Sequence, residues 1–125
     1  MSDHPSNFSA STLATFTCRD GGLAELALRD APRRNALGTA MFDALHAALR
    51  AAHDAPAERM RALVLRGDGP VFCGGFDLSE CVQRPATLRT LVEQLSAAVR
   101  ALRALPMPVV AQVQGAALAG GCALL

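Results

Sequence analysis

The sequence predicts an α/β fold in which strands pair substantially in parallel. Three observations support this fold class: short apolar stretches typical of strands, amphipathic stretches with helical spacing between them, and connections long enough for helical crossovers. The expected order is strand, strand, helix, strand, helix, strand, helix. A chain of 125 residues, 51% of them hydrophobic, is in the size range of one domain and can supply a core.

The chain is expected to begin with a flexible N-terminus, residues 1–12, followed by the N-terminal part of a domain over residues 13–125. The N-terminal segment is polar and lacks the basic and apolar regions of a secretory signal. Residues 13–29 contain two short strands on either side of the Asp-Gly-Gly sequence at 20–22, which favours a hairpin turn.

Two amphipathic helices follow a loop at residues 30–38, where Pro32 and Asn35 interrupt any periodicity. The first helix spans 39–54 and the second roughly 87–104. Their apolar positions are expected to be buried: Met41, Leu45, Leu49 and Ala52 in the first helix, and Leu88, Leu91, Val92, Leu95, Val99 and Leu102 in the second.

Two further apolar stretches, residues 62–67 and 106–115, predict strands. The chain ends at Leu125 inside an apolar segment, whereas termini are usually exposed. We therefore expect this chain to be part of a longer protein.

Composition argues against several classes of function. The net charge of +1 provides no electrostatic basis for binding nucleic acid or a membrane surface. No apolar run reaches the length of a membrane span, so a cytoplasmic location is expected. All twelve basic residues are arginines and the chain has no Tyr, which excludes a Schiff-base lysine and a tyrosine acid within this stretch.

No metal site is expected, because the cysteines show no C-x-x-C spacing and no paired histidine ligands. They are expected to be free, buried thiols in a reducing compartment. His46 and His53 fall outside the apolar stripe of the 39–54 helix and are expected to be solvated on its surface. The four cysteines are Cys18, Cys73, Cys81 and Cys122.

Two glycine-containing segments have the same organisation. ALVLRGDGPVFCGGFDL (62–78) and VVAQVQGAALAGGCALL (109–125) each run from an apolar strand through glycines into an apolar or helical segment. Two such segments facing one another could direct two backbone N–H groups at a developing oxyanion. The alternative is that both are packing turns, where glycine lets a helix lie close to a strand. Neither segment matches a P-loop or G-x-G-x-x-G, so a nucleotide-binding fold is disfavoured.

Three segments resemble the crotonase superfamily, which includes enoyl-CoA hydratases and isomerases: APRRNAL (31–37), residues 61–80 and residues 106–125. The resemblance covers nearly the whole chain from about Leu13, in the order and spacing of the family. It implies a crotonase-like spiral of ββα units, of which this chain would hold the N-terminal half. It also implies a full-length homotrimer or dimer of trimers.

The function implied by the resemblance is that of a lyase or isomerase acting on acyl-CoA thioesters in fatty acid metabolism. Coenzyme A would be the substrate carrier, and no other cofactor is expected. The backbone N–H groups of Phe76 and Gly120 would form the oxyanion hole that stabilises a thioester enolate. The acyl-CoA-binding positions carried over are Arg34, Ala36, Gly74, Gly75, Phe76, Asp77, Leu78 and Gly120.

The individual residues also have simpler interpretations. Arg34 would meet the coenzyme A phosphates and Ala36 would act through its backbone, but Arg34 is equally compatible with a solvated surface position. Asp77 precedes a short helix and reads as its N-cap rather than as an acid. Glu80 lies in the first turn, where a carboxylate favours the helix dipole. Cys73 and Cys122 are expected to pack beside the glycine segments rather than to act as nucleophiles.

One departure from the family pattern bears on the reaction. Family hydratases carry two catalytic glutamates, and the first lies three residues after the oxyanion glycine, where this chain has Ala123. An alanine can neither orient water nor transfer a proton, which argues against two-glutamate hydration. Isomerases, decarboxylases, hydrolases and dehalogenases of the superfamily keep the oxyanion hole and place their acid/base groups elsewhere. The competing function is a non-catalytic acyl-CoA-binding homologue, and the chain by itself is expected to be inactive.

Overall fold

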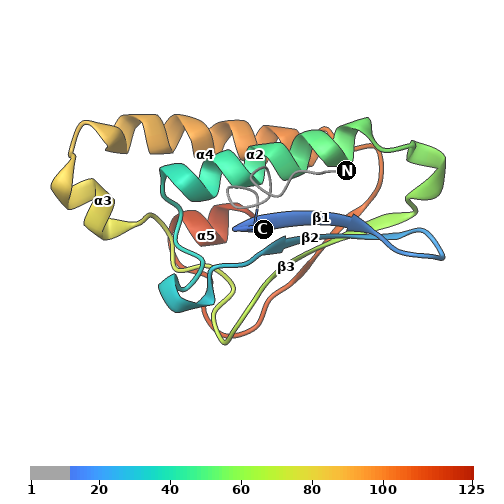
Figure 1. Ribbon diagram of the computed structural model, residues 1–125, viewed down its shortest axis with the longest axis horizontal. Helices are drawn as coiled ribbons and strands as arrows, with labels where there is room; N and C mark the ends of the chain where they lie inside the picture. Colours follow the sequence, from blue (N-terminus) through green and yellow to red (C-terminus); the bar gives the residue numbers. More distant parts are fainter. Residues whose placement is uncertain (1–11) are drawn as a thin grey trace, which may run out of the picture.

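A four-stranded mixed sheet forms the floor of the molecule, and two long helices cover one of its faces (Figure 1). The computed structural model describes residues 12–125. The strands are β1 (Ala14–Cys18), β2 (Leu23–Leu28), β3 (Ala62–Gly67) and β4 (Val109–Gln112), and they lie side by side in this order. β1 and β2 are antiparallel, whereas the other two pairs are parallel, as expected where helices make the connections.

The hairpin between β1 and β2 confirms the predicted turn. Gly21 and Gly22 both have positive φ, at 88° and 89°, a conformation that glycine adopts without strain. The N-terminal segment predicted to be flexible lies, up to residue 11, outside the described residues.

Helices occupy all the long connections. The long helices are α2 (Thr39–Asp54) and α4 (Thr87–Arg103), and the short ones are α3 (Leu78–Gln83) and α5 (Gly120–Ala123). Two 3-10 turns, η2 (Ala31–Arg33) and η3 (Ala57–Arg59), precede α2 and β3. The predicted apolar face of α2 is confirmed, because Met41, Leu45, Leu49 and Ala52 are all buried. No helix within residues 12–125 has both the length and the apolar character needed to cross a bilayer.

The core lies between α2, α4 and the inner face of the sheet. Phe42 packs there with leucines from β2 and β3, all at most 1% exposed. Burying one such side chain typically contributes about 1.5–3 kcal/mol. The leucines are Leu26, Leu28, Leu63 and Leu65.

The apolar stripe predicted on α4 is only partly correct. Leu91 and Leu102 are buried, but Leu88 and Val92 are 45% and 47% exposed. In Figure 1 the start of α4 extends past the start of α2 toward α3, and at this end Leu91 is buried whereas Leu88 and Val92 stay exposed. Helical spacing predicts which side chains share a face, but burial also requires a neighbour along the whole length of that face.

The fourth strand is shorter and more exposed than predicted. Residues 106–115 were expected to be a strand, whereas β4 has four residues, all of them exposed. Pro106 and Pro108 precede it and have no N–H to donate to a ladder. Gly115, with φ of +62°, turns the chain after it. β4 therefore forms an edge of the sheet, bonded only to β3 among the described strands.

Candidate functional site

The two glycine segments meet where the parallel strands β3 and β4 end. Phe72 N–H donates to Ala116 O at 3.0 Å, and Leu118 N–H donates to Cys73 O at 3.0 Å. Cys73 and Ala117 also form a parallel bridge. Because the carboxyl ends of parallel strands lie at one edge of a sheet, segments that are distant in the sequence become neighbours there.

Glycine permits the close approach of the two segments at two positions. A Cβ on Gly121 would lie 2.5 Å from Cys73 O, a distance that real side chains do not tolerate. Gly75 has φ of +93°, and a Cβ there would lie 3.0 Å from Leu118 O. The packing interpretation of these glycines is therefore confirmed for Gly121 and Gly75. It does not compete with a binding role, because the same close contact brings backbone N–H groups together.

The Phe76 N–H is directed by its neighbours. Leu37 N–H donates to Gly75 O at 2.7 Å, and Asp77 N–H donates to Leu37 O at 3.0 Å. In extended backbone, successive peptide groups point to opposite sides, so the Phe76 N–H points away from Leu37. Within residues 12–125 no hydrogen-bond acceptor takes this N–H.

The Gly120 N–H likewise has no hydrogen-bond acceptor among the described residues. Its nitrogen lies 3.8 Å from the position that a Cβ on Gly75 would occupy. A Cβ on Gly120 would in turn lie 3.7 Å from the Phe76 ring. The structure thus brings the two predicted oxyanion-hole residues next to each other, each with an unpaired backbone donor.

Ala119 has an unusual conformation next to this donor. Its φ is +47° and its ψ is −115°, in a region that is close to glycine-only. A strained residue beside an unpaired donor is a feature often found at functional sites. Sequence reasoning identified Ala119 only as the first position of the Ala-Gly-Gly stretch and gave no signal of strain.

A groove of about 450 Å³ runs beside these donors. Six of the eight predicted acyl-CoA-binding residues line it: Arg34, Ala36, Gly74, Phe76, Asp77 and Leu78. Gly75 and Gly120 are buried next to it instead. Sequence reasoning missed five lining residues, namely Arg33, Val71, Ser79, Ala116 and Leu118. Their positions next to predicted residues were the only available signal.

Both carboxylates of the first segment are engaged in structural contacts. Asp77 caps α3, accepting from the N–H groups of Ser79 and Glu80, which confirms the predicted cap. Glu80 reaches across to the start of α2, where Thr39 N–H donates to it at 2.9 Å and the Thr39 hydroxyl donates to its other oxygen. Arg84 also pairs with Glu80, at 3.2 Å.

These contacts keep both carboxylates ionised. The Ser79 hydroxyl, more than any other group, lowers the pKa of Asp77, and the Arg33 guanidinium 3.7 Å away adds to this. The Thr39 hydroxyl and N–H lower the pKa of Glu80. A general acid needs a raised pKa, so neither carboxyl is suited to donate a proton.

The cysteines and histidines differ partly from expectation. Cys73 is buried as predicted; burial raises the pKa of its thiol, and the S–H donates to Asn35 O at 3.2 Å. Cys18 and Cys122 are exposed, so the expectation of buried thiols was wrong for these two, because they lie where no described segment covers them. His53 is exposed as predicted. His46 is instead half-buried beside Phe42, and its Nε2 atom has no partner in residues 12–125.

Ala123 lies outside the groove. It ends α5 and lines a separate cavity of about 510 Å³ bordered by α4 and β4. Within the described part of the chain, no group of three His, Cys, Asp or Glu side chains could hold a metal ion. The groove therefore offers arginine charge beside Phe76 and close to Gly120, and its one carboxylate, Asp77, is occupied as a cap.

Comparison with known proteins identifies the family of this chain. The family model described as enoyl-CoA hydratase/isomerase matches residues 19–125. The rat protein named enoyl-CoA hydratase domain-containing protein 3, mitochondrial, is 35% identical over 113 residues, covering 89% of this chain and 37% of its own length. A probable enoyl-CoA hydratase of Rhodobacter capsulatus is 39% identical over 104 residues, covering 82% of this chain and 39% of its own length.

Among solved structures, an enoyl-CoA hydratase from Mycobacterium smegmatis superposes with a TM-score of 0.82 at 34% identity, covering 90% of this chain and 44% of that one. The chain thus spans less than half the length of these three proteins. Its strands and helices follow the crotonase-like fold over that part. The chain belongs to the enoyl-CoA hydratase/isomerase family of the crotonase superfamily.

Proposed function

We propose that the backbone N–H groups of Phe76 and Gly120 form an oxyanion hole for the carbonyl oxygen of an acyl-CoA thioester. The observation that carries this proposal is that both N–H groups, on adjacent segments, have no acceptor within residues 12–125. Amide donors are rarely left unpaired inside a protein unless a ligand or water satisfies them. Family membership supports the choice of a thioester as that ligand.

The chemistry of such a hole is electrostatic. Removing a proton next to a thioester, or adding water to its conjugated alkene, moves negative charge onto the carbonyl oxygen. Two fixed donors stabilise that charge without reorganising, and each typically contributes on the order of 10²–10³ in rate. Phe76 and Gly120 would thus stabilise an enolate, while the acid/base group that moves the proton must come from outside Asp77 and Glu80.

The groove is proposed to hold the coenzyme A part of the substrate. Arg33 and Arg34 are exposed along it and offer positive charge to phosphates. Ala36 lines the same groove and would contact the ligand through its backbone. Each exposed arginine is expected to contribute no more than about 1 kcal/mol. We propose that coenzyme A serves as substrate carrier and that no further cofactor takes part.

Ala123 favours a second candidate function, an acyl-CoA-binding protein that does not hydrate its ligand. The chain has no glutamate at the position where family hydratases carry one, and the described carboxylates next to the groove are occupied as caps. Binding and polarisation of the thioester would then remain without efficient addition of water. Turnover of crotonyl-CoA by the full-length gene product separates the two candidates.

The assembly and location of the full-length gene product are further proposals. By resemblance to its family we propose a homotrimer or dimer of trimers in the cytoplasm, acting as a lyase or isomerase in fatty acid metabolism. Light scattering tests the assembly. Cell fractionation tests the location, and it is needed because the rat relative is named as a mitochondrial protein.

Two substitutions at Gly120 test the oxyanion hole. Gly120→Pro removes the N–H, whereas Gly120→Ala keeps it and adds a Cβ that makes only ordinary contacts, 3.4 Å from Leu37 and Leu95. Infrared spectra of bound crotonyl-CoA, isotope-labelled at its carbonyl carbon, report polarisation by the donors. We expect a lowered carbonyl stretch in the wild type and in Gly120→Ala, and a stretch near the value in water for Gly120→Pro. A folded Gly120→Pro variant with the wild-type stretch would refute the proposal.

A further inference from the structure

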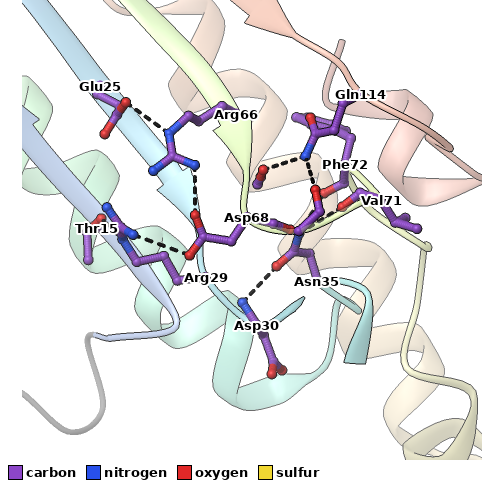
Figure 2. A network of polar contacts seen from close by, with 12 residues as sticks. Thr15, Glu25, Arg29, Asp30, Asn35, Arg66, Asp68, Val71, Phe72 and Gln114 are labelled. Atoms are coloured by element: carbon purple, nitrogen blue, oxygen red, sulfur yellow. Dashed lines mark hydrogen bonds and ion pairs between the residues drawn. The ribbon is translucent and has the colours of Figure 1, made fainter. Parts of the chain in front are cut away.

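Asn35 is a fully buried polar residue in the loop between β2 and α2. Its Oδ1 accepts the Asp30 N–H at 2.7 Å, which closes the loop on itself. Its Nδ2 lies 3.0 Å from each of three carbonyl oxygens of the first glycine segment, as Figure 2 shows in part. These carbonyls belong to Asp68, Val71 and Phe72. Both polar atoms of the Asn35 side chain therefore form hydrogen bonds within the protein.

The backbone around Asn35 adds to the same attachment. Arg34 and Asn35 both adopt the left-handed conformation, with φ of 56° and 54°, which asparagine tolerates better than most residues. This turn directs Arg34 O to the Gly74 N–H at 2.9 Å and Asn35 O to the Cys73 thiol. Leu37 then forms hydrogen bonds with Gly75 and Asp77, the two neighbours of Phe76. The loop at 30–37 thus runs along the segment that ends in the Phe76 donor and bonds it repeatedly.

Gln114, in the second glycine segment, bonds the first glycine segment from another direction. Gln114 Nε2 donates to the carbonyl oxygens of Gly67 and Gly69 (Figure 2). Asn35 and Gln114 together satisfy carbonyls at the start and middle of the first segment. The Phe72 carbonyl is buried, and leaving it without a donor would be unfavourable, so this part of the segment has little freedom to move away.

We propose that Asn35 is a positioning residue of the oxyanion hole. Its amide holds the first glycine segment against the 30–37 loop, so that the Phe76 N–H stays beside the Gly120 N–H and both face one oxygen. Asn35 itself lies behind the segment and does not contact the thioester. This inference rests on the proposed function of Phe76 and Gly120. Displacing one reacting group by about 1 Å can reduce the rate on the order of 10²-fold, so a small shift of this segment matters.

Two variants of the full-length gene product test this role. Asn35→Asp keeps the shape and the acceptor for Asp30 but replaces the amide donor with oxygen. Asn35→Gly removes the side chain while allowing the left-handed backbone. Arg66→Met is the matched control, because it breaks two ion pairs at the end of β3, to Glu25 and Asp68, and the Arg66 side chain forms no hydrogen bond or ion pair with residues 71–76.

The readouts separate positioning from general binding. Calorimetry compares affinity for crotonyl-CoA with affinity for free coenzyme A, and infrared spectra report the carbonyl stretch of the bound thioester. Both Asn35 variants should lose about threefold to tenfold in affinity for crotonyl-CoA relative to free coenzyme A. Their carbonyl stretch should return toward its value in water. Arg66→Met should keep the wild-type affinity ratio and stretch.

Three results would overturn the inference, and they differ in what they imply. Folded Asn35 variants with the wild-type affinity ratio and stretch would show that the amide does not position the donor. Loss of cooperative unfolding in both Asn35 variants, with Arg66→Met still folded, would assign Asn35 to folding alone. A wild-type protein that does not shift the carbonyl stretch would refute the proposed function itself, and this inference with it.

Discussion

Glu80→Ala should destabilise the protein through the start of α2. Glu80 belongs to α3, but its carboxylate accepts from the N–H and the hydroxyl of Thr39, the first residue of α2. The N-cap residue of α2 is Gly38, which has no side chain to cap the helix. A Cβ on Gly38 would lie 2.6 Å from Glu80 Oε1, so the space of a capping side chain is already filled by Glu80.

Glu80→Ala is expected to remove the stabilisation free energy of an N-cap and of a weak ion pair. Removing a capping side chain typically costs about 0.5–2 kcal/mol. The Arg84 pair adds little, because Arg84 is 65% exposed. We therefore expect Glu80→Ala to lower the free energy of unfolding by about 1–2 kcal/mol, seen as a lower urea midpoint with an unchanged m-value.

Glu93→Ala is the matched control. Glu93 also pairs with an arginine one turn away, Arg89, but both side chains are largely exposed, at 69% and 90%, and no hydrogen bond within residues 12–125 joins the Glu93 carboxylate to a helix end. This variant should change the free energy of unfolding by no more than about 0.5 kcal/mol. Equal losses from Glu80→Ala and Glu93→Ala would refute the reasoning, because the ion pair rather than the Thr39 contact would then carry the energy.

The pH dependence gives the same test a second readout. The pKa of Glu80 is lowered in the folded state, chiefly by Thr39, so the folded protein favours the ionised carboxylate. Its contribution is therefore present above the unfolded-state pKa and is lost as the pH falls through the folded-state pKa. The difference in unfolding free energy between wild type and Glu80→Ala should shrink below about pH 4. A difference that stays constant on acidification would contradict this.

Three further predictions follow from the site. Ala119→Gly should raise the free energy of unfolding by about 1 kcal/mol, because it relieves the strained conformation at φ +47°; an unchanged or lower urea midpoint would contradict the strain. Native protein should expose Cys18 and Cys122 to Ellman's reagent at once, whereas Cys73, buried and with a raised pKa, should react only on unfolding. Because Ala123 replaces a glutamate, the full-length gene product should hydrate crotonyl-CoA at least about 10²-fold more slowly than two-glutamate relatives, and comparable rates in a spectrophotometric assay would show that another group supplies the function.

Local sequence signals determined the secondary structure of this protein well. The helix predicted at residues 39–54 and the strand at 62–67 have the same bounds in the structure, and the hairpin turn lies at the Asp-Gly-Gly sequence. Helical spacing and turn glycines act within a few residues, so no distant partner is needed to read them. The Asp77 cap was predictable for the same reason, since it bonds Ser79 and Glu80.

The candidate site was predictable only as a set of positions. Resemblance to the family identified Phe76, Gly120 and most of the groove, but nothing local indicated which way their N–H groups point. That direction depends on Leu37, which bonds both neighbours of Phe76 from another part of the chain. Asn35 illustrates the same limit: in the sequence it only interrupts a pattern, whereas in the fold it is a buried residue that holds the first glycine segment.

What the sequence by itself determined, then, is the order of elements, the apolar face of α2 and the positions of the two glycine segments. The tertiary structure alone decided that Glu80 bonds Thr39, a residue 41 positions earlier, and that Leu88 stays exposed. It also placed Gly75, the neighbour of Phe76, beside Gly120, and left the N–H groups of Phe76 and Gly120 without an acceptor within residues 12–125. The physical reason is that these features depend on which segments touch, and parallel strand pairing brings together residues that are far apart along the chain.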